Sequence, residues 1–134
     1  MNTNSASGIK WDLHDLYAAH DDPAIAETLK DCRARADKFS ERVRPLFEDA
    51  NSLNAKDVLQ ALDELEVIYE ALGRIGTYAG LLYAADTAKP EYQDLEQQVE
   101  QRSTEIRNQL LFFELEWLEL GDETADRIMA DPRL

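Results

Sequence analysis

Hydrophobic residues recur at alternating spacings of four and three along most of this chain, a pattern typical of α-helices that pack through one face. The first run consists of Ile25, Leu29, Cys32, Ala36, Phe39, Val43 and Leu46. Asp22 is a suitable N-cap and Pro23 is favoured at the first helical position, whereas Pro45 cannot continue a helix. The pattern therefore predicts a helix over residues 23–44.

A second run predicts a longer helix over residues 54–84, which Ser52 or Asn54 would open. Its expected seam is Val58, Leu62, Leu65, Tyr69, Leu72, Gly76, Ala79 and Tyr83, beside a second stripe of Ile68, Ile75 and Leu82. So wide an apolar face can contact two neighbours. Gly73, Gly76 and Gly80 lie within it, although each glycine costs a helix about 1 kcal/mol relative to alanine. Two explanations are open: another backbone approaches closely, or the helix is locally kinked.

A third helix is predicted over residues 90–120, with Thr87 or Lys89 as its cap and Pro90 just inside. Its seam residues are Tyr92, Val99, Ile106, Leu110, Phe113, Trp117 and Leu120. Beyond them Leu111, Phe112, Leu115 and Leu118 spread the apolar surface around the helix, so we expect cover on several faces. Gly121 fits a helix stop, and residues 122–130 predict a short fourth helix that ends before Pro132.

The segment WDLHDLY, residues 11–17, predicts a docked helical turn after a polar, disordered lead-in over residues 1–10. Asp12 would cap the turn, and Trp11 and Leu16 fit a hydrophobic staple. The anchors of this turn would be Trp11, Leu13, Leu16 and Tyr17. The fold prediction is thus all-α: an antiparallel bundle of three long helices, with a short N-terminal turn and a short C-terminal helix, in one domain over residues 11–134.

The charge narrows the possible partners. The 134 residues carry a net charge of −14, which disfavours binding to nucleic acid or to anionic membranes. The N-terminus has no apolar stretch typical of a signal peptide, and one cysteine suits a reducing compartment, so we predict a cytoplasmic protein. Residues 29–44 have six cations and three anions, whereas residues 45–134 have seven cations and twenty anions. These charges would lie on solvated faces, or would pair the first long helix with later ones.

Few residues are candidates for chemistry. His14 and His20 would lie roughly 120° apart around a helix, and catalytic zinc needs three protein ligands, so we expect two solvated surface histidines. Cys32 lies in the first seam, which favours a packing role. The acidic groups Asp63/Glu64 and Glu114/Glu116/Glu119 are more typical of solvated helix faces than of catalytic carboxylates. The residues alone therefore predict no catalytic, cofactor-binding or metal-binding residue.

Three stretches in order resemble one family. WDLHDLYAAHDDPAI, ALGRIGTYAGLLYAADTAKPEYQ and LLFFELEWLEL are similar to successive blocks in the N-terminal region of oligoendopeptidase F-type metallopeptidases. His14 stands where that family usually has serine, and Lys89 replaces an acidic or amide cap. The resemblance covers residues 11–134. Members are zinc-dependent, mostly helical peptidases that cleave oligopeptides in a deep channel and bind the metal through H-E-x-x-H and a downstream glutamate.

The resemblance implies an N-terminal helical domain that forms a channel wall or lid and is not itself catalytic, because H-E-x-x-H is absent from these residues. Zinc, the oligopeptide substrate and the catalytic domain would belong to the parent protein. In the isolated chain, the apolar surface at the end of the third helix, with Phe112, Leu115 and Leu118, would be left bare and would favour a homodimer. The alternative is a free-standing helical interaction or adaptor module with coiled-coil-like seams. A third possibility is a small enzyme with a novel bundle site, which a zinc titration would expose.

Overall fold

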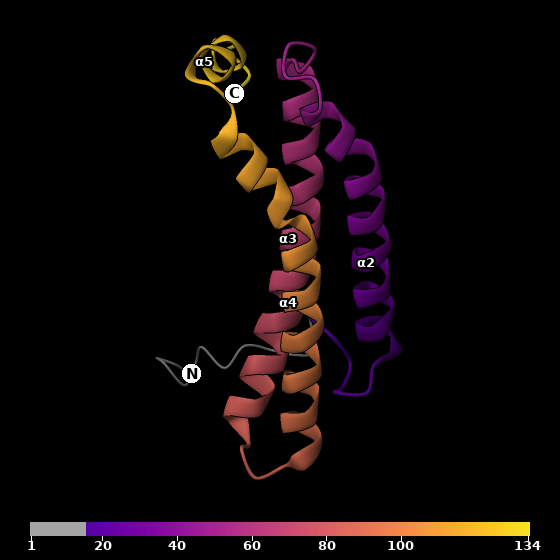
Figure 1. Cartoon of the computed structure of the whole chain (residues 1–134). Coiled ribbons are helices and arrows are strands. Elements are labelled where there is room, and N and C mark those ends of the chain that lie inside the picture. The colour runs from indigo at the N-terminus through magenta and orange to yellow at the C-terminus, as the bar shows by residue number, and fades with distance from the viewer. Residues whose placement is uncertain (1–15) are drawn as a thin grey trace, which may run out of the picture.

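A computed structural model describes residues 16–134, and every regular element within that range is helical. The elements are α2 (Pro23–Val43), the 3₁₀ helix η2 (Arg44–Phe47), α3 (Ala55–Ala85), α4 (Pro90–Glu119) and α5 (Asp122–Met129). The three long helices α2, α3 and α4 run antiparallel, and α5 lies at the end of the bundle where α3 begins (Figure 1). The predicted all-α antiparallel bundle with a short C-terminal helix is confirmed. None of the helices in the described part of the chain has the length and apolar character needed to cross a membrane.

Side-chain caps fix where the first two long helices begin. The Asp22 carboxylate accepts hydrogen bonds from the backbone N–H groups of Ala24, at 2.9 Å, and Ala18, at 3.0 Å. These bonds stabilise the charged form and hold the pKa of Asp22 below its ordinary value. The Asn54 side chain accepts from the Asp57 N–H at 3.0 Å, so Asn54 opens α3 and Ser52 does not.

The remaining helix ends follow from proline and local geometry. α2 ends at Val43, just before Pro45, as predicted, and the 3₁₀ helix η2 follows from Arg44 with Pro45 in its first turn. Lys89 is the N-cap of α4 without a side-chain capping bond, and Pro90 supplies the first helical residue. Gly121 follows α4 with φ −65°, so this helix ends without the left-handed conformation that glycine permits.

The seam predicted for α2 forms the centre of the core. Its six helical members Ile25, Leu29, Cys32, Ala36, Phe39 and Val43 are all buried, and Leu46 in η2 is half-buried. They pack against buried residues of α4, namely Val99, Ile106, Leu110 and Phe113, which were also predicted. The α4 seam residues Tyr92, Trp117 and Leu120 are half-buried.

The seam predicted for α3 is wrong at three positions, Leu62, Tyr69 and Gly76, which are all exposed. Leu62 and Tyr69 are exposed by 42% and 39%, whereas Ala61 and Ile68 are buried. A four–three pattern that starts at Val58 can continue through Ala61 or through Leu62. The prediction chose Leu62 because its side chain is larger, and this placed the buried face in the wrong register. The buried face actually follows Val58, Ala61, Leu65, Ile68, Leu72, Ile75 and Ala79.

Phe112 also differs from the prediction, which placed it on an uncovered face with Leu115 and Leu118. Only 8% of Phe112 is exposed, because its ring packs 5.8 Å from that of Phe39 and under the guanidinium group of Arg44. The end of α2 therefore covers this side of α4. Leu115 and Leu118 are exposed by 52% and 71%, as predicted.

The three glycines of α3 have no close neighbour within the described residues. A Cβ atom at Gly73, Gly76 or Gly80 would meet nothing within 4 Å. The first explanation for these glycines, close approach by another backbone, is therefore wrong for residues 16–134. They face open space beside α4.

This openness gives a stability prediction. Gly73→Ala and Gly76→Ala should each raise the free energy of unfolding by about 0.5–1 kcal/mol, because alanine loses less backbone entropy in a helix and clashes with nothing here. Urea unfolding followed by circular dichroism measures the change. Ala34→Gly, on the exposed surface of α2, is the matched control and should lose a similar amount. Destabilisation by either alanine substitution would contradict the open geometry.

The described end of the WDLHDLY segment is docked. Tyr17 is buried, its ring centroid lies 5.0 Å from that of Tyr78 on α3, and Leu16 is half-buried. These two predicted anchors are confirmed. The other predicted anchors, His14 and the predicted lead-in over residues 1–10 lie outside the described residues.

Candidate functional site

The described histidine is not fully solvated. His20 is half-buried, and its ring packs edge-on to Tyr92 with 5.6 Å between the ring centroids. The prediction of a free surface side chain is therefore wrong for His20, whereas His14 lies outside the described range. Among residues 16–134, no three His, Cys, Asp or Glu side chains come close enough to hold a metal ion.

Cys32 is a core residue. It is 1% exposed within the α2 seam, and burial raises the pKa of its thiol. A buried thiol with a raised pKa carries little of the thiolate form that acts as a nucleophile. The predicted packing role agrees with this position.

The acidic groups considered as catalytic carboxylates lie on helix surfaces. Glu64 pairs with Arg42 of α2, while its neighbour Asp63 is exposed. On α4, Glu114 and Glu119 are exposed and Glu116 is half-buried. The pairing of Glu64 with Arg42 fits the interpretation in which the cationic first helix pairs with later acidic helices.

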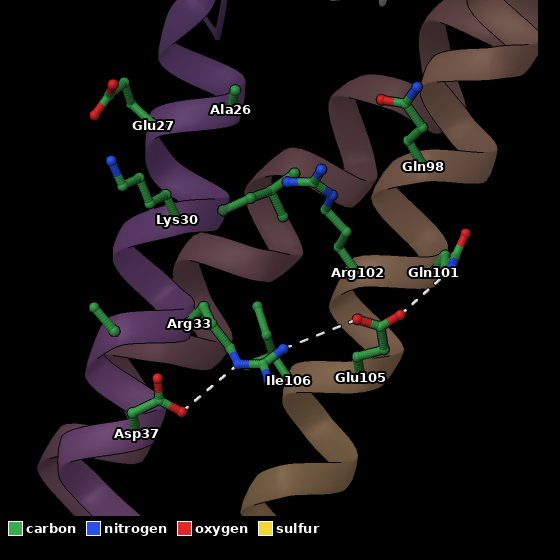
Figure 2. A pocket seen from close by; sticks show the side chains of 12 residues that line it. Ala26, Glu27, Lys30, Arg33, Asp37, Gln98, Gln101, Arg102, Glu105 and Ile106 are labelled. Carbon is green, nitrogen blue, oxygen red and sulfur yellow. Dashed lines mark hydrogen bonds and ion pairs between the residues drawn. The ribbon is translucent and has the colours of Figure 1, made fainter.

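A groove of about 870 Å³ lies between α2 and α4. Arg33 reaches from α2 toward α4, with its Nε 3.6 Å from Asp37 and its Nη1 3.9 Å from Glu105 (Figure 2). The charged residues of its lining are Glu27, Lys30, Arg33, Asp37, Arg102 and Glu105. Three cations and three anions neutralise one another, so this groove offers no excess charge to a ligand.

A smaller apolar groove lies where α5 meets the bundle, and we call it the apical groove. It has a volume of about 390 Å³ and is lined by Val58, Leu59, Leu62, Phe113, Trp117, Met129, Arg133 and Leu134. Its α5 wall is anchored by Ile128, which is 1% exposed. Arg127 adds hydrogen bonds to the carbonyl oxygens of Leu53, at 2.8 Å, and Ala50, at 3.2 Å.

The turn after α5 is held by a local ion pair. The Arg133 guanidinium donates to the Asp131 carboxylate at 2.7 and 2.9 Å, and its backbone N–H donates to the same carboxylate at 2.9 Å. These bonds hold the pKa of Asp131 at about 2. The carboxylate therefore stays charged at neutral pH and keeps the turn that places Leu134 in the apical groove.

A second apolar feature is a stripe on α4 that consists of Leu111, Leu115 and Leu118. These residues are 44%, 52% and 71% exposed and recur at helical spacing on one face. Large exposed aliphatic side chains at regular spacing are typical of protein contacts. The apical groove and this stripe are apolar surfaces that suit contact with another protein segment better than they suit catalysis.

Comparison with protein-family models, with curated proteins and with solved structures finds no match to this chain.

Proposed function

We propose that this chain is the N-terminal helical domain of a zinc-dependent oligopeptidase of the oligoendopeptidase F type. In this proposal the domain is non-catalytic and forms part of the wall or lid of the substrate channel. The catalytic domain of the parent chain is its partner, and short peptides are the substrate of the parent enzyme. The support is the order of the three sequence blocks and the way their residues pack.

The observation that carries the proposal is the contact between the first two blocks. Tyr17, in the first block, packs its ring 5.0 Å from Tyr78, in the second. Blocks that are far apart in sequence but touch in the fold can be kept together because they stabilise one another. The tyrosine contact therefore gives the resemblance a structural reason.

The third block packs on a part of α2 that lies outside the other two blocks. Its two phenylalanines, Phe112 and Phe113, each lie 5.8 Å from Phe39 of α2. The later residues of the block include the exposed Leu115 and Leu118. One half of this block thus builds the core of the domain, and the other half offers surface to a neighbouring domain.

A free-standing interaction module is the second candidate, and the apical groove favours it. An apolar groove open to solvent suits a helix or loop of a separate protein as well as a segment of the same chain. The two candidates differ in whether peptidase chemistry accompanies the domain.

The experiment is to express the chain alone and in cis with the segment that follows it in its gene. A quenched fluorescent oligopeptide and a zinc chelator then report metal-dependent hydrolysis. We expect no hydrolysis by the chain alone and chelator-sensitive hydrolysis by the longer protein. Hydrolysis by neither protein would favour the interaction module, and hydrolysis by the purified chain alone would exclude both candidates.

We also expect the isolated chain to self-associate through the α4 stripe. Burial of this surface recovers about 25 cal/mol per Å² before association costs, and the −14 charge that opposes it is screened within about 8 Å at physiological salt. Light scattering after size exclusion, at low and moderate salt, should give a dimer that Leu118→Lys dissociates. A monomer at high concentration in both buffers would contradict this expectation.

A further inference from the structure

A small groove between α2 and α3 begins at the docked Tyr17, and we call it the α2/α3 groove. It has a volume of about 260 Å³ and is lined by Tyr17, Thr28, Val67, Glu70, Ala71 and Arg74. Val67 is 48% exposed although it is next to the buried Ile68, and Ala71 is half-buried. Residues 16–134 therefore leave an aliphatic side chain of this groove open to solvent.

The chain reaches the α2/α3 groove from residues 11–15. Tyr17 lines the groove and packs its ring 5.0 Å from that of Tyr78, and Leu16 is half-buried against the core. These contacts fix the point from which the preceding residues extend. Because an extended chain advances at most about 3.5 Å per residue, Trp11 is within about 21 Å of Tyr17 and can reach a groove of this size.

The groove and residues 11–15 are complementary in apolar surface and in charge. The segment combines apolar and acidic side chains, namely Trp11, Asp12, Leu13 and Asp15. Arg74 borders the groove with 59% of its side chain exposed, and its ion pair with Glu70 spans 3.9 Å. Because an exposed pair of this length contributes little, the Arg74 guanidinium group remains available to a carboxylate or to the face of an indole ring.

Covalent attachment favours this segment over a separate partner. A short link to Tyr17 keeps residues 11–15 at an effective concentration in the millimolar range. A second copy of the chain must instead overcome the repulsion between two molecules that each carry a charge of −14. The occupant that the observations favour is therefore the chain's own N-terminal segment.

We propose that residues 11–15 fill the α2/α3 groove, with the Trp11 ring on Val67 and Ala71 and the acidic side chains beside Arg74. The segment then joins the start of α2 to the middle of α3 and closes this face of the bundle. The apical groove and the α4 stripe are left as the apolar surfaces that can meet a partner. The inference does not rest on the peptidase proposal.

The test uses the fact that the chain has two tryptophans, Trp11 and Trp117. Trp117→Phe in the full chain leaves Trp11 as the reporter, and circular dichroism checks that the variant is folded. The uncharged quencher acrylamide should quench Trp11 at least about threefold less in the native protein than in urea, because a packed ring is shielded from solvent. The native emission maximum should also lie at a shorter wavelength. Equal quenching in the two states would overturn the proposal.

Variants in the Trp117→Phe background locate the Trp11 ring. Val67→Asp should raise acrylamide quenching of Trp11 at least about twofold, because the ring would have to cover an unpaired carboxylate. Leu62→Asp is the matched control, since Leu62 lies on the same helix, is 42% exposed and lines the apical groove instead. It should leave the quenching unchanged. Equal effects of the two variants, or no effect of Val67→Asp, would overturn the proposal.

Charge reversal tests the same placement through a different contact. Arg74→Glu should raise the quenching of Trp11, because it repels the acidic residues of the segment. Asp12→Lys/Asp15→Lys in the same chain should then restore the shielding. No effect of Arg74→Glu, or no rescue by the two lysines, would overturn the role of Arg74. Shielding of Trp11 that disappears on dilution would place a second copy on the ring and would overturn the proposal.

Discussion

Phe39→Ala should lower the free energy of unfolding by about 3–5 kcal/mol, the largest single effect that we expect from a core truncation in this chain. Phe39 is 1% exposed, and its ring centroid lies 5.8 Å from those of both Phe112 and Phe113. Truncation leaves a cavity where α2 meets α4 and removes the aromatic contacts of two neighbours. Urea unfolding of the variant and the wild type measures the loss.

The matched control for Phe39→Ala is Leu118→Ala, which truncates a large side chain that is 71% exposed. Its effect should stay within about 0.5 kcal/mol, as is usual for surface substitutions. Similar losses for the two variants would mean that the buried and exposed faces of the bundle are misassigned.

Ile128→Ala should cost about 2–4 kcal/mol and release α5 from the bundle before the rest of the protein unfolds. Ile128 is the buried residue of α5 and packs it against the bundle. Arg127 also ties α5 to the loop before α3 through its hydrogen bonds. Hydrogen exchange should show loss of protection in α5 at denaturant concentrations that leave α2 protected. The fluorescence of Trp117, which lines the apical groove beside α5, should shift in the same range.

Met129→Ala is the control for Ile128→Ala, because the Met129 side chain is next to Ile128 in sequence but is 53% exposed. We expect a loss below about 1 kcal/mol and no change in the protection of α5. If Ile128→Ala unfolds the whole chain in one transition, α5 is part of the central cooperative unit and the apical groove is more rigid than we infer.

Helix positions were predictable because each helix carries its own signals. Asp22 and Asn54 cap the helices that follow them, and Pro45 and Pro90 mark where helices end and begin. These effects act within a few residues, so the sequence contains them fully. The buried face of a helix was predictable where the apolar residues fit only one four–three pattern, as they do in α2.

The errors arise where burial depends on a neighbouring helix. Ala61 and Leu62 both continue the spacing from Val58, and only the position of the other helices decides which is buried. Phe112 is covered because the end of α2 reaches it, which no local pattern reveals. The apical groove needs α3, α4 and α5 together, so no single stretch of the sequence specifies it.

The sequence of the natural reading frame beyond Leu134 tests most directly our proposal that this helical domain belongs to a zinc peptidase. If the domain belongs to an oligoendopeptidase F-type enzyme, the frame continues for several hundred codons and encodes an H-E-x-x-H segment followed by a further glutamate. A stop codon shortly after Leu134, or a long continuation without that segment, would contradict the claim and leave the interaction module as the function of the chain.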